Sequence, residues 1–381
     1  MKNKQKAKNI RFIHTLDQIE GLPPEQKKDL ARTAQTYRFY ANDYYLSLID
    51  WNDPHDPIRR LIVPDNGELE RWGDFDPSGE VNFTVMPGVE HKYPSTALLL
   101  VSNTCGGICR YCFRKRVFIS SEGDILKDLP AAAAYIREHA EITNVLLTGG
   151  DPLALATGKL EIILNALLPA EHVRIIRIGS KMPAFNPFRI TEDPTLAELI
   201  RHIQKHGKKI YIMTHFDHPR ELTVEAMEAI ACLRRAGADL ANQTPIIAGI
   251  NDDPDVLAEL FRQLSFAGIA PYYLFQCRPA SGNKHLAVPI ETGYEIFEQA
   301  CSKVSGLAKR ARFVMSHITG KIEIIGLDAD RVYMKYHRAA EEETSGRFFV
   351  CRRNPDAYWL DDYETFSTPQ SPARYPAYGP E

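Results

Sequence analysis

The sequence predicts an α/β protein in which a parallel sheet forms a full or partial (β/α) barrel. Two observations predict this fold. Short β-branched runs alternate with longer amphipathic stretches between about residues 95 and 316, and polar, chemically reactive residues follow the ends of these runs. Alternation at this spacing is typical of βαβ units. Because ligands of such sheets bind at the carboxyl ends of the strands, we expect a functional site there.

The expected elements follow the chain in order. An N-terminal helix is expected at 24–37, and the barrel strands are expected at 144–148, 174–178, 209–213, 240–250 and 272–275. Helices are expected between them at 129–139, 160–168, 193–206, 223–236 and 255–266, and further strands at 312–315, 322–325, 331–336 and 347–351. We expect an N-terminal helical cap at 1–95, a barrel at 96–315, a segment with a C-terminal hairpin extension at 316–366, and a disordered tail at 367–381.

Composition excludes several classes of protein. A formal charge of −3 gives no indication of a nucleic-acid partner. No apolar run approaches the roughly 20 residues that span a bilayer, and the basic N-terminus lacks the apolar segment of a signal peptide. Seven cysteines, of which three are clustered, do not form the pattern of a disulfide framework. The simplest setting is a reducing cytoplasm without membrane attachment.

The clustered cysteines are the main chemical feature of the sequence. Cys105, Cys109 and Cys112 have C-x3-C-x2-C spacing and follow the apolar run 97–101. Three thiolates are one too few to close a tetrahedral metal site, so an iron–sulfur cube held by them keeps one iron open for a small ligand. The alternatives are a structural zinc site completed by a histidine, and buried thiols without a metal.

These residues resemble the radical S-adenosylmethionine (SAM) superfamily. Members hold a [4Fe-4S] cluster on such cysteines, and the open iron binds the methionine moiety of SAM. Gly149, Gly150 and Asp151 follow the strand expected at 144–148, and by themselves they are equally well explained as a tight turn. Beside the cysteine loop they resemble the superfamily's Gly-Gly-Glu-type motif, which implies SAM binding. The resemblance implies a partial (β/α) barrel and a 5′-deoxyadenosyl radical.

Further motifs narrow the resemblance to the lysine 2,3-aminomutase family. They run in order from about residue 50 to about residue 325, and they are the segments 53–59, 93–94, 109–116, 177–180, 214–219, 242–244 and 271–273. The resemblance implies that pyridoxal 5′-phosphate (PLP) carries the migrating amine on a lysine. Lys321 is the candidate lysine, although its segment 316–321 is shorter than the family's glycine-rich run.

The same resemblance assigns roles to other residues. It implies that His215 and Gln243 lie near the adenosyl group of SAM and that Arg114 pairs with the substrate α-carboxylate. Arg177 is a candidate partner for the PLP phosphate, and an ion pair at the edge of the core explains it equally well. A guanidinium suits these tasks because it binds carboxylates and phosphates through two parallel hydrogen bonds.

The positions that select the substrate depart from those of lysine-specific members. Two aspartates hold the distal ammonium of lysine in those enzymes, whereas this chain has Arg278 and, by alignment, Ser316 at these places. Like charges about 4 Å apart cost about 4 kcal/mol at an effective dielectric of about 20. We therefore expect a substrate whose distal group is a carboxylate or neutral, with glutamate favoured over lysine. The alternatives are that Arg278 turns outward or that the alignment is shifted.

The sequence thus predicts an isomerase that moves an α-amino group to the β-carbon. Alternative functions are lysine 2,3-aminomutation, radical modification of a peptidyl lysine, and a non-catalytic zinc-binding module. The resemblance also implies an electron donor such as flavodoxin or ferredoxin, and a homo-oligomer that associates through the helical cap.

Overall fold

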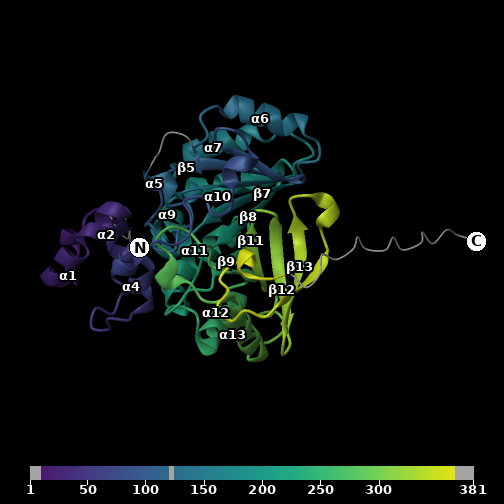
Figure 1. Ribbon diagram of the computed structural model, residues 1–381. Coiled ribbons are helices and arrows are strands. Elements are labelled where there is room, and N and C mark those ends of the chain that lie inside the picture. Colours follow the sequence, from purple (N-terminus) through teal and green to yellow (C-terminus); the bar gives the residue numbers. More distant parts are fainter. Residues whose placement is uncertain (1–9, 120–123, 365–381) are drawn as a thin grey trace, which may run out of the picture.

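A twelve-stranded sheet forms the centre of the molecule, and its strand order is β14-β13-β12-β11-β10-β9-β8-β7-β6-β5-β4-β3. The computed structural model describes residues 10–119 and 124–364 (Figure 1). The seven strands from β5 to β11 run parallel to one another. They are β5 (Thr96–Ser102), β6 (Asn144–Gly149), β7 (Ile175–Ser180), β8 (Lys209–Thr214), β9 (Asp239–Pro245), β10 (Ala270–Phe275) and β11 (Arg312–His317).

Antiparallel strands extend the sheet at both edges. At one edge lie β12 (Gly320–Leu327), β13 (Arg331–Ala339) and β14 (Phe348–Arg352); at the other lie β4 (Val89–Tyr93) and β3 (Thr84–Met86). The sheet therefore reaches into the segment that the sequence assigned to the helical cap. No strand was expected there because Pro87 and Gly88 separate β3 from β4 and interrupt the alternation.

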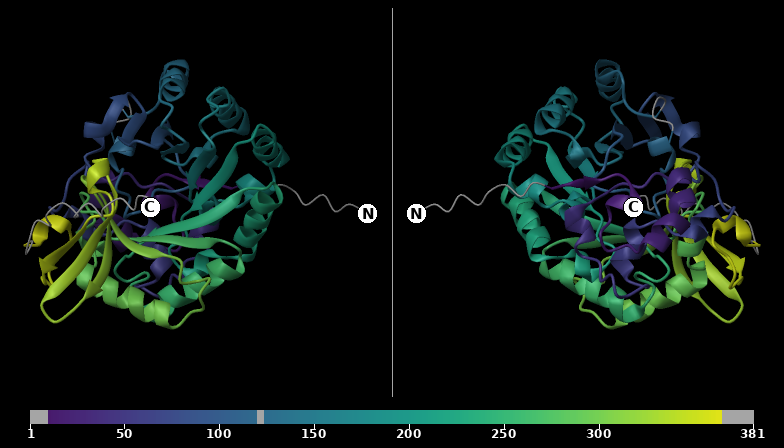
Figure 2. Two further views of the ribbon diagram at one scale, coloured as in Figure 1. Left: turned by 90° about the vertical axis from the view of Figure 1, so that its right-hand side faces the viewer. Right: turned by 90° about the vertical axis from the view of Figure 1, so that its left-hand side faces the viewer.

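The long helices lie outside the curved sheet, where they form an arc around it (Figure 2). They are α6 (Leu129–Glu138), α7 (Thr157–Ala166), α10 (Pro194–Lys205), α11 (Val224–Arg235), α12 (Pro254–Phe266) and α13 (Ile290–Ser302). Their starts are encoded locally: the Asp193 and Asp253 side chains accept backbone N–H groups of the first turn, and a proline follows each. Short helices α5 (Arg116–Ile119), α8 (Met182–Phe185) and α9 (Phe188–Thr191) lie in the connections.

The N-terminal helices gather on the side of the molecule opposite β12 to β14 (Figure 1). They are α1 (Pro24–Asp29), α2 (Ala31–Thr36), α3 (Asp43–Leu46) and α4 (Pro57–Ile62), accompanied by the short strands β1 (Phe12–Ile13) and β2 (Ala41–Asn42). The single helix expected at 24–37 is two helices that meet at Leu30. These elements pack around their own buried cluster, which also includes Phe185 of the barrel.

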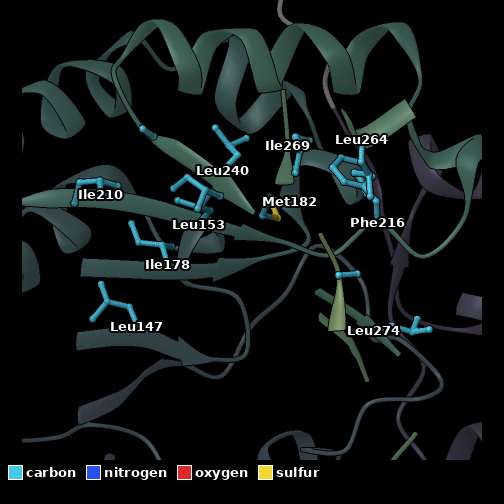
Figure 3. Packing of buried hydrophobic residues seen from close by; sticks show 14 of the residues in the cluster. Leu147, Leu153, Ile178, Met182, Ile210, Phe216, Leu240, Leu264, Ile269 and Leu274 are labelled. Carbon is cyan, nitrogen blue, oxygen red and sulfur yellow. The ribbon is translucent and has the colours of Figure 1, made fainter. Parts of the chain in front are cut away.

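The main core lies between the sheet and the outer helices (Figure 3). Leu147, Ile178, Ile210 and Leu240 come from four neighbouring strands and are almost fully buried in it. The strands that were expected lie near their predicted positions. The strand expected at 240–250 ends at Pro245, and the strand expected at 331–336 continues to Ala339. Among the described residues, no helix is long and apolar enough to cross a membrane. The tail expected at 367–381 lies outside the described residues.

Candidate active site

Two adjoining cavities lie along the parallel strands, the first at their carboxyl ends and the second at earlier positions such as Thr96 and Arg177. Six residues line both: Leu98, Arg114, Leu146, Gln243, Arg278 and Lys321. The first cavity adds, among others, Phe113, Gly179, Met213, His215 and Pro245. The second adds, among others, Glu90, Lys92, Tyr93, Arg177, Ser316 and Arg338. The sequence-predicted residues Arg114, Arg177, His215, Gln243, Arg278, Ser316 and Lys321 are therefore brought together.

The cysteine loop begins where β5 ends and is fixed by the end of β6. The Gly150 N–H donates to the carbonyl of Ser102, and the Asp151 N–H donates to the carbonyl of Thr104, at 2.5 and 2.7 Å. A Cβ atom on Gly150 would lie 2.5 Å from the Thr104 carbonyl oxygen, so only glycine permits this approach. The segment 149–151 thus holds the loop in place.

The side chain of Asp151 has a structural task. Its carboxylate accepts hydrogen bonds from the backbone N–H groups of Leu153, Lys181 and Met182 and from the Ser180 hydroxyl. Burial raises the pKa of Asp151 to about 6, and these four donors oppose that shift. Gly149, Gly150 and Asp151 are absent from the described lining of both cavities.

Cys105, Cys109 and Cys112 are free thiols. They lie close enough that the charges of Cys109 and Cys112 contribute to the raised pKa of Cys105. Burial raises the pKa of each thiol, a cost that bonding to iron removes because a cluster binds thiolates. Within the described part of the chain, no group of three His, Cys, Asp or Glu residues could hold one metal ion.

A buried polar network centred on Asp217 holds the cysteine loop in place. Asp217 accepts hydrogen bonds from the hydroxyls of Tyr111 (2.6 Å) and Thr244 (2.5 Å) and from the Lys181 ammonium (2.7 Å). Lys181 also pairs with Glu221. Tyr111 lies between the second and third cysteines, so the network fixes the middle of the loop to β9 and to the segment after β8.

Arg114 is buried and is held by Glu80, which the sequence analysis did not single out. The Arg114 Nε and Nη2 atoms donate to the two Glu80 oxygens at 3.1 and 2.7 Å, and Nη1 donates to the Thr148 hydroxyl at 3.0 Å. Burial alone would raise the pKa of Glu80, but Arg114 and Arg116 outweigh it and lower the pKa to about 2. Glu80 thus occupies the side of the guanidinium that carries Nε, and the Nη1 end faces the cavities.

Arg278 also lines both cavities, which excludes the alternative that it turns outward. Its guanidinium stacks on the Phe113 ring at 3.7 Å, and Nη1 donates to the Ser78 hydroxyl. Burial lowers the pKa of Arg278 to about 10, which leaves the side chain charged at neutral pH. Ser316 is 7% exposed and lines the same cavity as Arg278.

Lys321 is the second residue of β12, and its amine lies among aromatic rings. Nζ is 5.3, 5.6 and 5.9 Å from the ring centres of Phe275, Tyr273 and Tyr93. Burial lowers the pKa of Lys321 far below the ordinary lysine value, and the charges of Arg278 and other cations add to this shift. A neutral amine is the form that attacks a carbonyl group.

Two arginines in the second cavity lack an acidic partner within the described residues. Arg177 donates from Nε to the Asn144 side-chain oxygen at 2.8 Å, so the ion pair considered as an alternative is not formed. Arg338 donates to the hydroxyls of Ser95 (2.7 Å) and Thr96 (3.0 Å). Nothing in the local sequence pointed to Arg338, because the expected strand ended at residue 336.

Two more ionisable residues of this cavity were missed. Burial, reinforced by the charge of Glu80, raises the pKa of Glu90 to about 8. Lys92 donates to the His317 carbonyl at 2.7 Å, and burial together with Arg278 lowers the pKa of Lys92 to about 8. Both residues lie on β4, where no strand was expected, so no feature of the local sequence placed them in the cavity.

His215 and Gln243 line the first cavity, where the sequence analysis expected the adenosyl group. Burial lowers the pKa of His215 to about 4, so the imidazole is neutral at physiological pH and offers one hydrogen-bond donor and one acceptor. Gly179 of β7 and Pro245, the last residue of β9, also line this cavity.

Comparison with known proteins agrees with this geometry. A family model described as the radical SAM superfamily matches residues 99–261, which include the three cysteines, Asp151 and His215. The fold and the cysteine loop thus define a radical SAM enzyme.

Similar proteins narrow the class further. A protein of Aquifex aeolicus named "Putative L-lysine 2,3-aminomutase" is 52% identical over 94% of this chain and 96% of its own length. The L-lysine 2,3-aminomutase of Acetoanaerobium sticklandii is 36% identical over 79% of this chain and 72% of its own length. The glutamate 2,3-aminomutase of Clostridioides difficile is also 36% identical, over 80% of this chain and 71% of its own length. The chain belongs to the lysine 2,3-aminomutase family.

Membership confirms the expected enzyme class, a radical SAM aminomutase, and implies a [4Fe-4S] cluster, SAM and PLP. The residues present fit these groups. Three free thiols are grouped on one loop. The Lys321 amine lines one cavity with the half-buried Arg177 and Arg338, and these arginines have no acidic partner among the described residues. The buried Tyr93 hydroxyl beside them has no hydrogen-bond partner in the same part of the chain.

Proposed function

We propose that this enzyme is a 2,3-aminomutase whose substrate carries a distal carboxylate, with glutamate as the simplest candidate. The observation that supports the proposal is Arg278, which is half-buried, charged and lines both cavities, at a position where lysine-specific members carry an aspartate. Arg278 has no ion-pair partner among the described residues. Its guanidinium can therefore donate two hydrogen bonds to a substrate carboxylate.

The charge of the second cavity supports an anionic ligand. Five cationic side chains line it beside the Lys321 amine: Lys92, Arg114, Arg177, Arg278 and Arg338. Only two carboxyl groups, Glu80 and Glu90, accompany them among the described residues. Glu80 is already paired with Arg114 and Arg116, and the raised pKa of Glu90 keeps it mostly protonated at neutral pH. An ammonium group entering this cavity would face an excess of positive charge.

The reaction divides between the bound groups and the side chains. SAM on the cluster supplies the hydrogen-abstracting radical, and PLP carries the migrating amine. Arg114 is proposed to bind the α-carboxylate through its Nη1 end while Glu80 holds the opposite side. Arg278 binds the distal carboxylate. These two contacts fix both ends of the substrate, so that one β-hydrogen is presented to the first cavity.

The remaining residues complete the site. Lys321 provides the amine that holds PLP, and its low pKa keeps that amine unprotonated. His215 and Gln243 are proposed to bind the adenosyl group, and the backbone after β6 to contact the methionine moiety. Phe113 lies against both guanidinium groups, with ring centres 4.7 Å from Arg114 and 3.7 Å from Arg278. It fixes the spacing of the two carboxylate-binding groups.

Lysine is the second candidate substrate, because the names of several relatives include it. Glu90 also offers it a carboxyl group in the second cavity. For lysine to bind, however, Glu90 would have to ionise close to Glu80, which itself raises the pKa of Glu90. The acidic substrate requires no such change in protonation.

The test uses the reconstituted holoenzyme, incubated anaerobically with SAM, PLP, a reductant, and glutamate, glutamine or lysine in turn. Products are identified by mass spectrometry. We expect glutamate to give the β-amino acid, and Arg278→Gln to reduce kcat/KM for glutamate about tenfold or more while leaving glutamine much less affected. Arg278→Lys serves as the charge-preserving control. Turnover of lysine alone by the unaltered enzyme would contradict the proposal.

A further inference from the structure

Arg338 and Lys321 are direct cross-strand partners in the antiparallel pair β12–β13. Opposite residues in such a pair point to the same face of the sheet, with Cβ atoms about 5 Å apart. Gly320 permits this approach: its φ is +150°, and a Cβ atom there would lie 2.4 Å from the Arg338 carbonyl oxygen. The fold therefore places the Arg338 guanidinium beside the amine of Lys321, inside one cavity.

Arg177 reaches the same cavity from β7. Burial lowers the pKa of both arginines, and the positive charge of Arg338 contributes to the shift at Arg177. Within residues 10–119 and 124–364, their side chains contact only neutral groups: the Asn144 amide, the Ser95 and Thr96 hydroxyls and the Tyr93 ring. Two half-buried guanidinium groups that share a cavity and pair with no carboxylate among the described residues are stabilised when an anion binds between them.

We propose that Arg338, together with Arg177, binds the phosphate group of the PLP carried on Lys321. The inference rests on the proposed role of Lys321. A phosphate monoester matches the geometry because each guanidinium can donate two hydrogen bonds to it and its charge offsets both cations. The Ser95 and Thr96 hydroxyls hold the Arg338 guanidinium in place, and the unpartnered Tyr93 hydroxyl beside it is a further donor.

The other cationic side chains of the cavity already have other binding partners or proposed roles. Lys92 donates to the His317 carbonyl, and Arg114 is held by Glu80. Arg278 lies on the Phe113 ring at the junction of both cavities, where the substrate side chain is proposed to bind. Arg177 and Arg338 line the second cavity only, whereas Arg278 lines both. The phosphate and the substrate carboxylate therefore have separate binding groups.

The test measures binding of PLP and of pyridoxal, which lacks the phosphate, to cluster-containing protein without substrate. Dissociation constants come from titrating the visible absorbance of the enzyme-bound cofactor. We expect the unaltered protein to prefer PLP strongly, and Arg338→Ala to reduce this preference tenfold or more while pyridoxal affinity changes little. Arg338→Lys should retain part of the preference. Arg331→Ala, on the exposed start of the same strand, is the matched control and should retain all of it.

An unchanged ratio of the two affinities in Arg338→Ala would overturn the assignment, whatever the stability of that variant. A parallel loss of both affinities would also overturn it, because it would show a general defect of the site. No substrate is present, so a change in the ratio cannot come from lost substrate binding. If the absorbance persists in Lys321→Ala, the lysine assignment fails instead, and this outcome is distinguishable from failure at Arg338.

Discussion

The two carboxylate oxygens of Glu80 accept hydrogen bonds from Nε and Nη2 of Arg114. Nη1 of Arg114 is left to donate to the Thr148 hydroxyl, on the side of the cavities. The residue that the sequence assigns to the substrate α-carboxylate is therefore already part of an ion pair. We interpret Glu80 as a positioning residue: it fixes the plane of the guanidinium and keeps it charged, so that the substrate meets a rigid partner.

The first prediction concerns this pair. Glu80→Gln removes the charge that compensates Arg114 and Arg116, and breaking a buried ion pair on one side costs about 3 to 5 kcal/mol. We expect a lower Tm and a KM for the amino acid raised more than kcat is lowered. The control is Asp124→Asn, which pairs with Arg116 at 3.0 Å and should change KM little. A Glu80→Gln enzyme with unchanged KM would show that Arg114 needs no orienting partner.

The second prediction concerns Glu90. Its pKa is about 8 in the folded protein and 4.5 ordinarily, because of burial and the neighbouring Glu80; Arg114, Arg116 and Arg278 oppose the shift. Between pH 4.5 and pH 8, Glu90 is protonated in the folded state and ionised in the unfolded state. This carboxyl group alone therefore lowers the free energy of unfolding as pH rises, by at most about 1.4 kcal/mol per pH unit. Urea denaturation below and above pH 8 measures the effect.

Glu90→Gln should flatten that part of the pH dependence and stabilise the protein most above pH 8. The exposed Glu343→Gln is the control and should leave the profile as it was. If Glu90→Gln keeps the original slope, another group is responsible for it, and the argument that the cavity lacks negative charge at neutral pH is lost.

The third prediction concerns Lys321. Burial and the charges of Arg278, Arg177, Lys92 and Arg338 hold its pKa well below the ordinary 10.5. We expect the rate of PLP loading to be independent of pH in the neutral range and to fall only when acid protonates the amine. Stopped-flow absorbance measures the rate. Lys321→Ala should give no bound-cofactor band, whereas Lys335→Ala on the neighbouring strand should load normally. A loading rate that keeps rising toward pH 10.5 would contradict the low pKa.

The strands and the cysteine loop were predictable because their signals are local. Period-2 alternation and β-branched residues mark β6 to β10, and polar residues mark where these strands end. Cys105, Cys109 and Cys112 lie within eight residues of one another, so their spacing alone indicates a shared ligand. Arg278 was singled out because a family motif fixes its position next to Gln276 and Cys277.

The charged lining of the second cavity could not be found in the same way. Glu80 and Arg114 are 34 residues apart, and Arg338 meets Ser95 across 243 residues. The contact of Arg338 with Ser95 depends on the curvature of the whole sheet, because β13 and β5 lie toward opposite ends of the strand order. No local pattern encodes that curvature. Arg338 became a candidate only when the register placed it opposite Lys321.

The last prediction concerns Asp217, which anchors the cysteine loop through the Tyr111 hydroxyl. Asp217→Asn weakens three buried hydrogen bonds, one of them to the Lys181 ammonium, and we expect a loss of about 2 to 4 kcal/mol in stability. Tyr111→Phe removes only the bond to the loop, so it should cost about 1 kcal/mol. Both variants should contain less iron after anaerobic reconstitution, because the loop that carries the thiols is less fixed. Iron and sulfide content per chain, with the Tm of each variant, checks this. Full iron content in both would mean that the backbone bonds from Gly150 and Asp151 suffice to hold the loop.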